Sequence, residues 1–179
     1  PIYFDNVVNF EIVPFDTTDV LGVGEELPFR DNSFQAVISI AVLEHVKDPF
    51  RCASEIARVL KPGGELYCSV PFLQPLHGYP HHYYNMSHQG LRNLFDTLLK
   101  VDDVDVSPSG LPLWSMAWIL KSWANGLRGN ARRKFLGMRI KDFIGDARNY
   151  VREDFVTELP REKNLELASG CTLHAHKPK

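Results

Sequence analysis

The sequence predicts an α/β domain built on a mostly parallel sheet, and two observations lead to this prediction. Residues 35–42 (QAVISIAV) are a nearly continuous apolar run without alternation, which is typical of a parallel strand covered on both faces. A helical pattern and a second strand-like run, residues 65–70, follow it. This strand, helix, strand order predicts a right-handed crossover between parallel strands.

The elements around this crossover follow from local signals. Residues 6–12 and 19–22 are β-rich and are predicted as short strands that precede the long one. Asp48 is expected to cap the crossover helix, with Pro49 at its first position. The segment 61–64 (KPGG) predicts the end of this helix, because proline and glycine do not continue it.

The second half of the chain is predicted to be largely helical. A second helix is expected to begin at an N-cap, Ser87, while the alternating segments 101–106 and 171–176 predict edge strands, the last of them antiparallel. Between them, residues 110–168 are interpreted as a helical insertion or lid. We therefore expect one domain over residues 1–179 that contains this insertion.

Composition excludes several classes of protein. The chain has 179 residues, 44% of them hydrophobic, which suits a single soluble domain. A net charge of −2 gives no overall field that would attract nucleic acid. No apolar run reaches the ~20 residues of a membrane span. Three cysteines without CxxC spacing favour reduced thiols and a cytoplasmic location.

The Gly22-Val23-Gly24 segment is not a phosphate-binding loop. The dinucleotide motif needs a third glycine and a helix directly after it. Here Glu25 and Glu26 follow and then Pro28, which oppose both an anionic phosphate and a helix. We predict a turn at the end of a strand.

Residues 25–72 resemble the class I S-adenosylmethionine-dependent methyltransferases, in particular the broad group called type 11. The patterns that carry the resemblance stand in the family's order: Leu27-Pro28-Phe29, Asp31-Asn32-Ser33-Phe34, Leu43-Glu44-His45-Val46 and Glu55-Ile56-x-Arg58-Val59-Leu60-Lys61-Pro62-Gly63-Gly64. The resemblance implies a Rossmann-like methyltransferase sheet, S-adenosylmethionine as cofactor and S-adenosylhomocysteine as product.

The resemblance also implies cofactor contacts. Glu11 stands where the family's acid binds the ribose hydroxyls, and Val23 stands where an Asp commonly contacts adenine. The other implied contacts are the adjoining turn and the tip of the next strand: Gly24, Glu25, Ile40, Ala41, Val42 and His45. Two alternatives stay open, since Glu11 could be a solvated acid and His45 could cap a turn or pack on the helix.

The family's glycine-rich loop after its first strand is not found in the sequence. It should lie upstream of Val7, so the pattern is expected to begin at the second strand and to be N-terminally incomplete. Three explanations stay open: a truncated fragment of a longer enzyme, completion of the sheet by a second copy, or a degenerate non-catalytic relative. We favour the fragment, because the remaining motifs are intact.

Residues 71–91 concentrate histidines and tyrosines beyond a strand end, where the resembling enzymes hold the acceptor. A histidine suits proton removal from an oxygen or nitrogen acceptor, and His77 and His82 are the candidate bases. The candidate acceptor contacts are Tyr79, His81, Tyr83, Tyr84 and Trp114. No metal is expected, because the segment lacks an HExxH pattern. In the alternative reading, the aromatic side chains only cover the sheet.

Residues 110–127 carry all three tryptophans and precede a basic segment. A lid with a solvated basic face is the favoured interpretation, and a membrane surface or a lipid-linked substrate is the alternative. Exposed apolar residues there, or an unpaired sheet edge, would favour self-association.

The sequence thus predicts methyl transfer to a small or medium-sized acceptor. The alternative is a non-catalytic methyltransferase-fold relative that acts as a binding or partner subunit.

Overall fold

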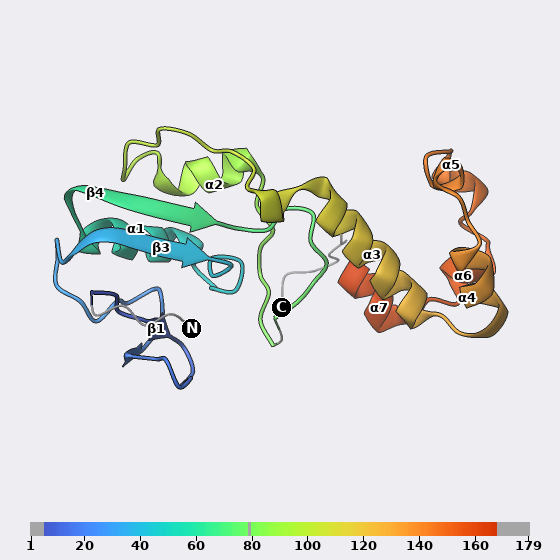
Figure 1. Cartoon of the computed structure of the whole chain (residues 1–179), viewed down its shortest axis with the longest axis horizontal. Helices are drawn as coiled ribbons and strands as arrows, with labels where there is room; N and C mark the ends of the chain where they lie inside the picture. Colours follow the sequence, from blue (N-terminus) through green and yellow to red (C-terminus); the bar gives the residue numbers. More distant parts are fainter. Residues whose placement is uncertain (1–5, 79, 168–179) are drawn as a thin grey trace, which may run out of the picture. The chain divides into compact units, whose positions relative to one another are not determined.

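The computed structural model describes residues 6–78 and 80–167, which fall into two compact units. The first unit comprises residues 6–72, 78 and 80–105 and contains the strands of the described chain. The second unit comprises residues 73–77 and 106–167 and is helical (Figure 1).

Two parallel strand pairs form in the first unit. The strands are β1 (Phe10–Glu11), β2 (Val20–Leu21), β3 (Phe34–Ile40) and β4 (Leu60–Ser69). β1 pairs with β2 and β3 pairs with β4, and both pairs are parallel as predicted. Among the described residues they make two separate two-stranded sheets and not the single sheet expected, because no described strand bonds to both pairs.

The crossover between β3 and β4 is the helix α1 (Pro49–Val59). Its start is as predicted: the Asp48 carboxylate accepts a hydrogen bond of 3.0 Å from the Arg51 amide, and Pro49 takes the first position. The helix ends before residues 61–64, and the chain enters β4 there through an irregularity in the register with β3. The predicted strand, helix, strand unit is confirmed.

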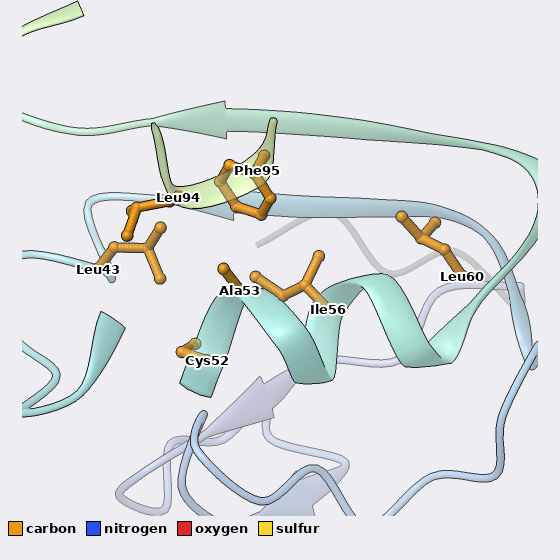
Figure 2. Close-up of a cluster of buried hydrophobic side chains, with 7 residues drawn as sticks. All are labelled: Leu43, Cys52, Ala53, Ile56, Leu60, Leu94 and Phe95. Atoms are coloured by element: carbon orange, nitrogen blue, oxygen red, sulfur yellow. The ribbon is translucent and has the colours of Figure 1, made fainter. Parts of the chain in front are cut away.

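The core of the first unit lies between α1, the β3–β4 pair and α2 (His88–Phe95), as Figure 2 shows. The predicted cap Ser87 accepts from the Gly90 amide, so the start of α2 is also confirmed. Leu94 and Phe95 turn inward from α2 toward the α1 side of the core. Apolar burial of this kind, rather than helix propensity, stabilises such short helices.

The other face of the β3–β4 pair is not covered by the described residues. Ile38 is 71% exposed, and its cross-strand neighbour Tyr67 is 53% exposed. The prediction that the strand at residues 35–42 is covered on both faces is therefore wrong for the described part of the chain. An apolar run reports a preference for burial and does not supply the element that would cover it.

The second unit confirms the expectation of a mostly helical region up to residue 167. Its elements are η1 (Pro108–Gly110), α3 (Pro112–Gly126), α4 (Gly129–Leu136), α5 (Ile140–Phe143), η2 (Ala147–Asn149), α6 (Asp154–Thr157) and α7 (Arg161–Leu167). α3 packs against α7 and α4, and α4 packs against α6 (Figure 1). No helix in the described ranges is both long and apolar enough to cross a membrane.

One predicted strand does not form. Residues 101–106 have no strand structure, and no described strand forms a hydrogen-bond ladder with them. The predicted antiparallel strand at 171–176 lies outside the described residues.

An ion pair on α1 fastens the loop that joins β2 to β3. Arg58 donates from Nε and Nη2 to the two carboxylate oxygens of Glu55, at 2.8 and 2.7 Å. Its Nη1 reaches the Phe29 carbonyl and the Asp31 carboxylate, both at 2.8 Å, and Nη2 reaches the Leu27 carbonyl at 3.0 Å. The Leu27 amide donates in turn to Glu55 at 2.8 Å. We call this network the Glu55–Arg58 clamp.

Removing the guanidinium is expected to destabilise the first unit, because the carbonyls of Leu27 and Phe29 and the Glu55 carboxylate lose their donor together. Arg58→Ala should lower the midpoint of thermal unfolding by several degrees. Arg51→Ala, an exposed arginine on the same helix, is the control and should change it little. Equal effects of the two substitutions would contradict a role for the clamp.

The clamp also predicts an acid dependence of stability. Hydrogen bonds from Arg58 hold the pKa of Glu55 below its ordinary value of 4.5 in the folded chain. A lowered pKa stabilises the fold above the ordinary value, and this contribution is lost as the pH falls through the folded pKa. Denaturant titrations should therefore show the stability gap between the natural protein and Glu55→Gln narrowing below about pH 4.5. A gap that stays constant with pH would refute this origin.

Candidate functional site

The tip of β3 is strained. Ala41 follows the strand with φ at 53°, a left-handed conformation that is uncommon for a residue with a side chain. Its amide donates to the Ser69 carbonyl of β4 at 2.9 Å, which holds the turn in place. The flanking side chains Ile40 and Val42 are 58% and 40% exposed. Three predicted cofactor contacts therefore stand together at an accessible strand tip.

The carboxyl ends of β1 and β2 form a second part of the site. Glu11 is the last residue of β1, its side chain is exposed, and its carbonyl accepts from the Gly22 amide at 3.0 Å. Beyond β2 the chain makes a tight turn closed by a bridge between Val23 and Glu26. The predicted turn is confirmed, and no helix begins at Gly24. Because the strands are parallel, Glu11 and Val23 lie beyond the same edge.

This turn is fixed to the start of α1. The Glu25 carboxylate accepts from the amides of Lys47 and Asp48 at 3.2 and 3.4 Å. A side chain at Gly24 would place its Cβ 2.7 Å from the Cys52 sulfur, so only glycine fits there. Glu25 thus orders the loop before α1, a structural role that the sequence did not indicate.

An open cavity of about 700 Å³ lies between the turn and α1. It is lined by Val23, Glu25, Glu26, Lys47, Asp48, Pro49, Phe50, Arg51 and Tyr84. The hydroxyl of Tyr84 donates to the Lys47 carbonyl at 3.1 Å, which holds the ring at this wall. The structure therefore brings two predicted cofactor contacts, Val23 and Glu25, to the same cavity as a predicted acceptor contact.

The segment with the histidines and tyrosines is anchored through its backbone. The carbonyl of Glu44 accepts from the amides of Tyr83 and Tyr84 at 2.7 and 3.2 Å. The side chain of Glu44 is completely buried, beside the imidazole of His45 at 3.7 Å. In the sequence, Glu44 is marked only as part of the motif Leu43-Glu44-His45-Val46. The one signal in the sequence that could have predicted a role for Glu44 is its position between Leu43 and His45.

Two of the predicted histidines meet here. The rings of His45 and His82 lie edge to face with centroids 5.3 Å apart. Nδ1 of His45 is 2.6 Å from the His81 carbonyl, to which it donates, and Nε2 of His82 is 2.8 Å from the Asn85 side-chain oxygen. The His81 ring stacks on Tyr83 at 5.5 Å. The sequence did not predict a role for Asn85, because no motif distinguishes it from other loop residues.

Gly78 makes this packing feasible. It has φ at 64°, and a Cβ there would lie 2.3 Å from Cε1 of His45. A side chain at this position would therefore displace the imidazole. A glycine inside a segment rich in proline and histidine was the available signal, and sequence reasoning did not use it.

The remaining predicted residues are not part of the first unit as the structure describes it. His77 belongs to the second unit, where its ring is 5.2 Å from that of Trp118 and Nδ1 is 2.8 Å from the Pro75 carbonyl. Trp114 belongs to the same unit and is 61% exposed. Tyr79 lies outside the described residues. The first unit therefore unites His45, His81, His82, Tyr83 and Tyr84.

The thiols of the first unit have raised pKa values. Burial, with a smaller effect of Glu25, raises the pKa of Cys52 to about 12. Burial likewise raises the pKa of Cys68 to about 11. Nucleophilic cysteines usually have a lowered pKa, whereas Cys52 lies in the core of this unit and Cys68 packs against it.

Part of the chain is similar to known methyltransferases. Residues 6–68 match the family model described as a methyltransferase domain. An uncharacterized methyltransferase of Mycobacterium tuberculosis is 50% identical over 50 residues, 28% of this chain and 20% of that protein. One of Schizosaccharomyces pombe is 41% identical over 63 residues, 35% of this chain and 23% of that protein. The matches thus cover about a fifth of the length of these curated relatives.

Among solved structures, a SAM-dependent methyltransferase of Thermotoga maritima is similar with a TM-score of 0.39 and 25% identity, over 46% of this chain and 45% of that chain. The match over residues 6–68 contains the motifs at the strand ends and on α1 described above. The match over residues 6–68 therefore supports the predicted resemblance to the class I, S-adenosylmethionine-dependent methyltransferases.

Proposed function

We propose that the protein transfers a methyl group from S-adenosylmethionine to a small or medium-sized acceptor, with the first unit holding both reactants. One observation carries the proposal. Residues assigned to the cofactor by the family pattern, Val23 and Glu25, line the same open cavity as Tyr84, a residue expected to contact the acceptor. Methyl transfer needs two reactants held side by side, and this arrangement supports it.

The cofactor is assigned to the strand ends. The exposed Glu11 carboxylate would accept hydrogen bonds from the ribose hydroxyls, and the strained tip from Ile40 to Val42 would face the methionine end. Val23 would meet adenine through apolar contact, since it offers no hydrogen bond from its side chain. S-adenosylhomocysteine, the product, would occupy the same contacts.

The acceptor is assigned to the anchored aromatic segment. In the reaction an acceptor oxygen or nitrogen forms a bond to the methyl carbon, the carbon–sulfur bond breaks, and its electron pair stays on sulfur as a neutral thioether. The acceptor proton must leave, and His82 is our candidate base, oriented by its contact with Asn85. His81, Tyr83 and Tyr84 would position the acceptor. His77 stays a predicted alternative base, and Tyr79 and Trp114 stay predicted acceptor contacts.

The second unit is proposed to act as a lid over the acceptor, and the cytoplasm is the proposed location. Both rest on the sequence patterns given above.

The cofactor assignment is tested by filling the strand tip. Val42→Trp places an indole where the methionine end is expected and should weaken S-adenosylhomocysteine binding about tenfold or more, which corresponds to at least about 1.4 kcal/mol. Leu98→Trp, at a residue of similar exposure in the same unit, is the control. Calorimetric titration with S-adenosylhomocysteine measures the affinities of the natural protein and of the two variants. Unchanged affinity in Val42→Trp would sink the assignment.

The catalytic assignment is tested at His82. A panel of phenols, sugars and amines is screened for release of S-adenosylhomocysteine, and the best acceptor is used. His82→Gln should lower turnover about 100-fold without weakening cofactor binding, because proton removal alone is lost. His88→Gln, an exposed histidine at the start of α2, is the control. Cofactor binding without turnover on any acceptor would favour the non-catalytic alternative.

A further inference from the structure

Helix α3 is apolar on every side near its start. Each residue from Leu113 to Leu120 except Ser115 is apolar. Yet Trp114 is 61% exposed and Met116 is 52% exposed, and the residues that α3 buries lie near its end. A helix with apolar residues all round is normally covered on all sides, so this segment has apolar surface that the described chain does not cover.

The exposed segment continues into a groove. A hollow of about 350 Å³ lies between α3, α4 and the end of α5, and the residues that line it include Leu120, Lys121, Arg132, Leu136 and Phe143. Trp114 precedes Lys121 by seven residues, two helical turns, so both side chains leave the same side of α3. We call Trp114, Leu120, Lys121, Arg132, Leu136 and Phe143 the α3–α5 surface.

The charge around this surface has one sign. The cations of residues 107–145 are Lys121, Arg128, Arg132, Arg133, Lys134, Arg139 and Lys141, and the only acid in that range is Asp142. The whole chain nevertheless has a net charge of −2, so the cations are concentrated here. Lys134 pairs with Glu153 and Asp154, whereas Lys121 and Arg132 make no ion pair within the described ranges.

The indole N–H of Trp114 already has a hydrogen-bond acceptor within the second unit. This N–H donates to the Pro108 carbonyl at 2.9 Å. Burying a tryptophan is costly when its N–H has no hydrogen-bond acceptor. The Trp114 ring already has an acceptor, so it could enter lipid without this cost.

We infer that the α3–α5 surface binds an anionic lipid bilayer, on which the second unit lies without crossing it. Apolar side chains beside unpaired cations fit the boundary between acyl chains and acidic headgroups. A second copy of the chain fits less well, because the two basic segments would repel each other across the contact. The inference is independent of the proposed methyl transfer.

Vesicle flotation tests the inference on the natural protein. Vesicles of equal parts phosphatidylcholine and phosphatidylglycerol should bind about tenfold more protein than vesicles of phosphatidylcholine alone, and added salt should weaken the difference. Brominated lipid should quench tryptophan fluorescence, and Trp114→Phe should reduce the quenching. Trp114→Phe keeps an aromatic side chain, so a reduced quenching reports the loss of the indole and not a loss of apolar surface.

Paired substitutions separate the two contributions. The apolar pair Trp114→Gln with Leu136→Gln and the charge pair Lys121→Gln with Arg132→Gln should each lower binding about tenfold. Matched controls lie in the first unit: Ile12→Gln, at 72% exposure, and Lys100→Gln, whose side chain is 92% exposed. Neither control should change binding.

Three outcomes would overturn the inference. One is no binding to either vesicle, and another is equal binding to both compositions. The third is vesicle binding unaffected by the paired substitutions, together with a concentration-dependent dimer in sedimentation that the apolar pair abolishes. That last result would assign the surface to a second copy.

Discussion

The first unit depends on the Glu55–Arg58 clamp. A single guanidinium satisfies two backbone carbonyls of the loop between β2 and β3, together with the carboxylates of Glu55 and Asp31. Both clamp residues lie on α1, so the loop has one position relative to that helix. A hydrogen bond to a charged partner is stronger than one between neutral groups. The few hydrogen bonds of Arg58 can therefore hold the loop although this side chain is partly exposed.

The candidate site inherits its geometry from α1 in the same way. The clamp positions the loop on one side of the turn at Val23, while the Glu25 carboxylate fastens the turn to the amides before α1. At another wall of the cavity, the hydroxyl of Tyr84 donates to the Lys47 carbonyl and holds the aromatic ring. The cavity therefore has walls that are fixed by hydrogen bonds, and it is open to solvent.

The sequence predicted what local physics decides. The caps Asp48 and Ser87, the end of α1 before residues 61–64 and the turn after β2 follow from side chains acting on their own neighbours. Contacts across long separations were not predictable. The Glu-x-x-Arg pattern on α1 was visible, but the loop carbonyls it binds lie 29 and 31 residues away. The uncovered face at Ile38 and the missing strand at 101–106 were misjudged because a pattern does not reveal its tertiary partner.

The anchoring of the aromatic segment has an evolutionary consequence. The Glu44 carbonyl bonds the amides of Tyr83 and Tyr84, not their side chains, and the path of the chain at Gly78 depends on having no side chain at all. Mutations at positions 83 and 84 can therefore change the side chains of this segment while these backbone hydrogen bonds remain. We therefore expect evolution to vary positions 83 and 84 more freely than Gly78, where any Cβ would meet the His45 ring.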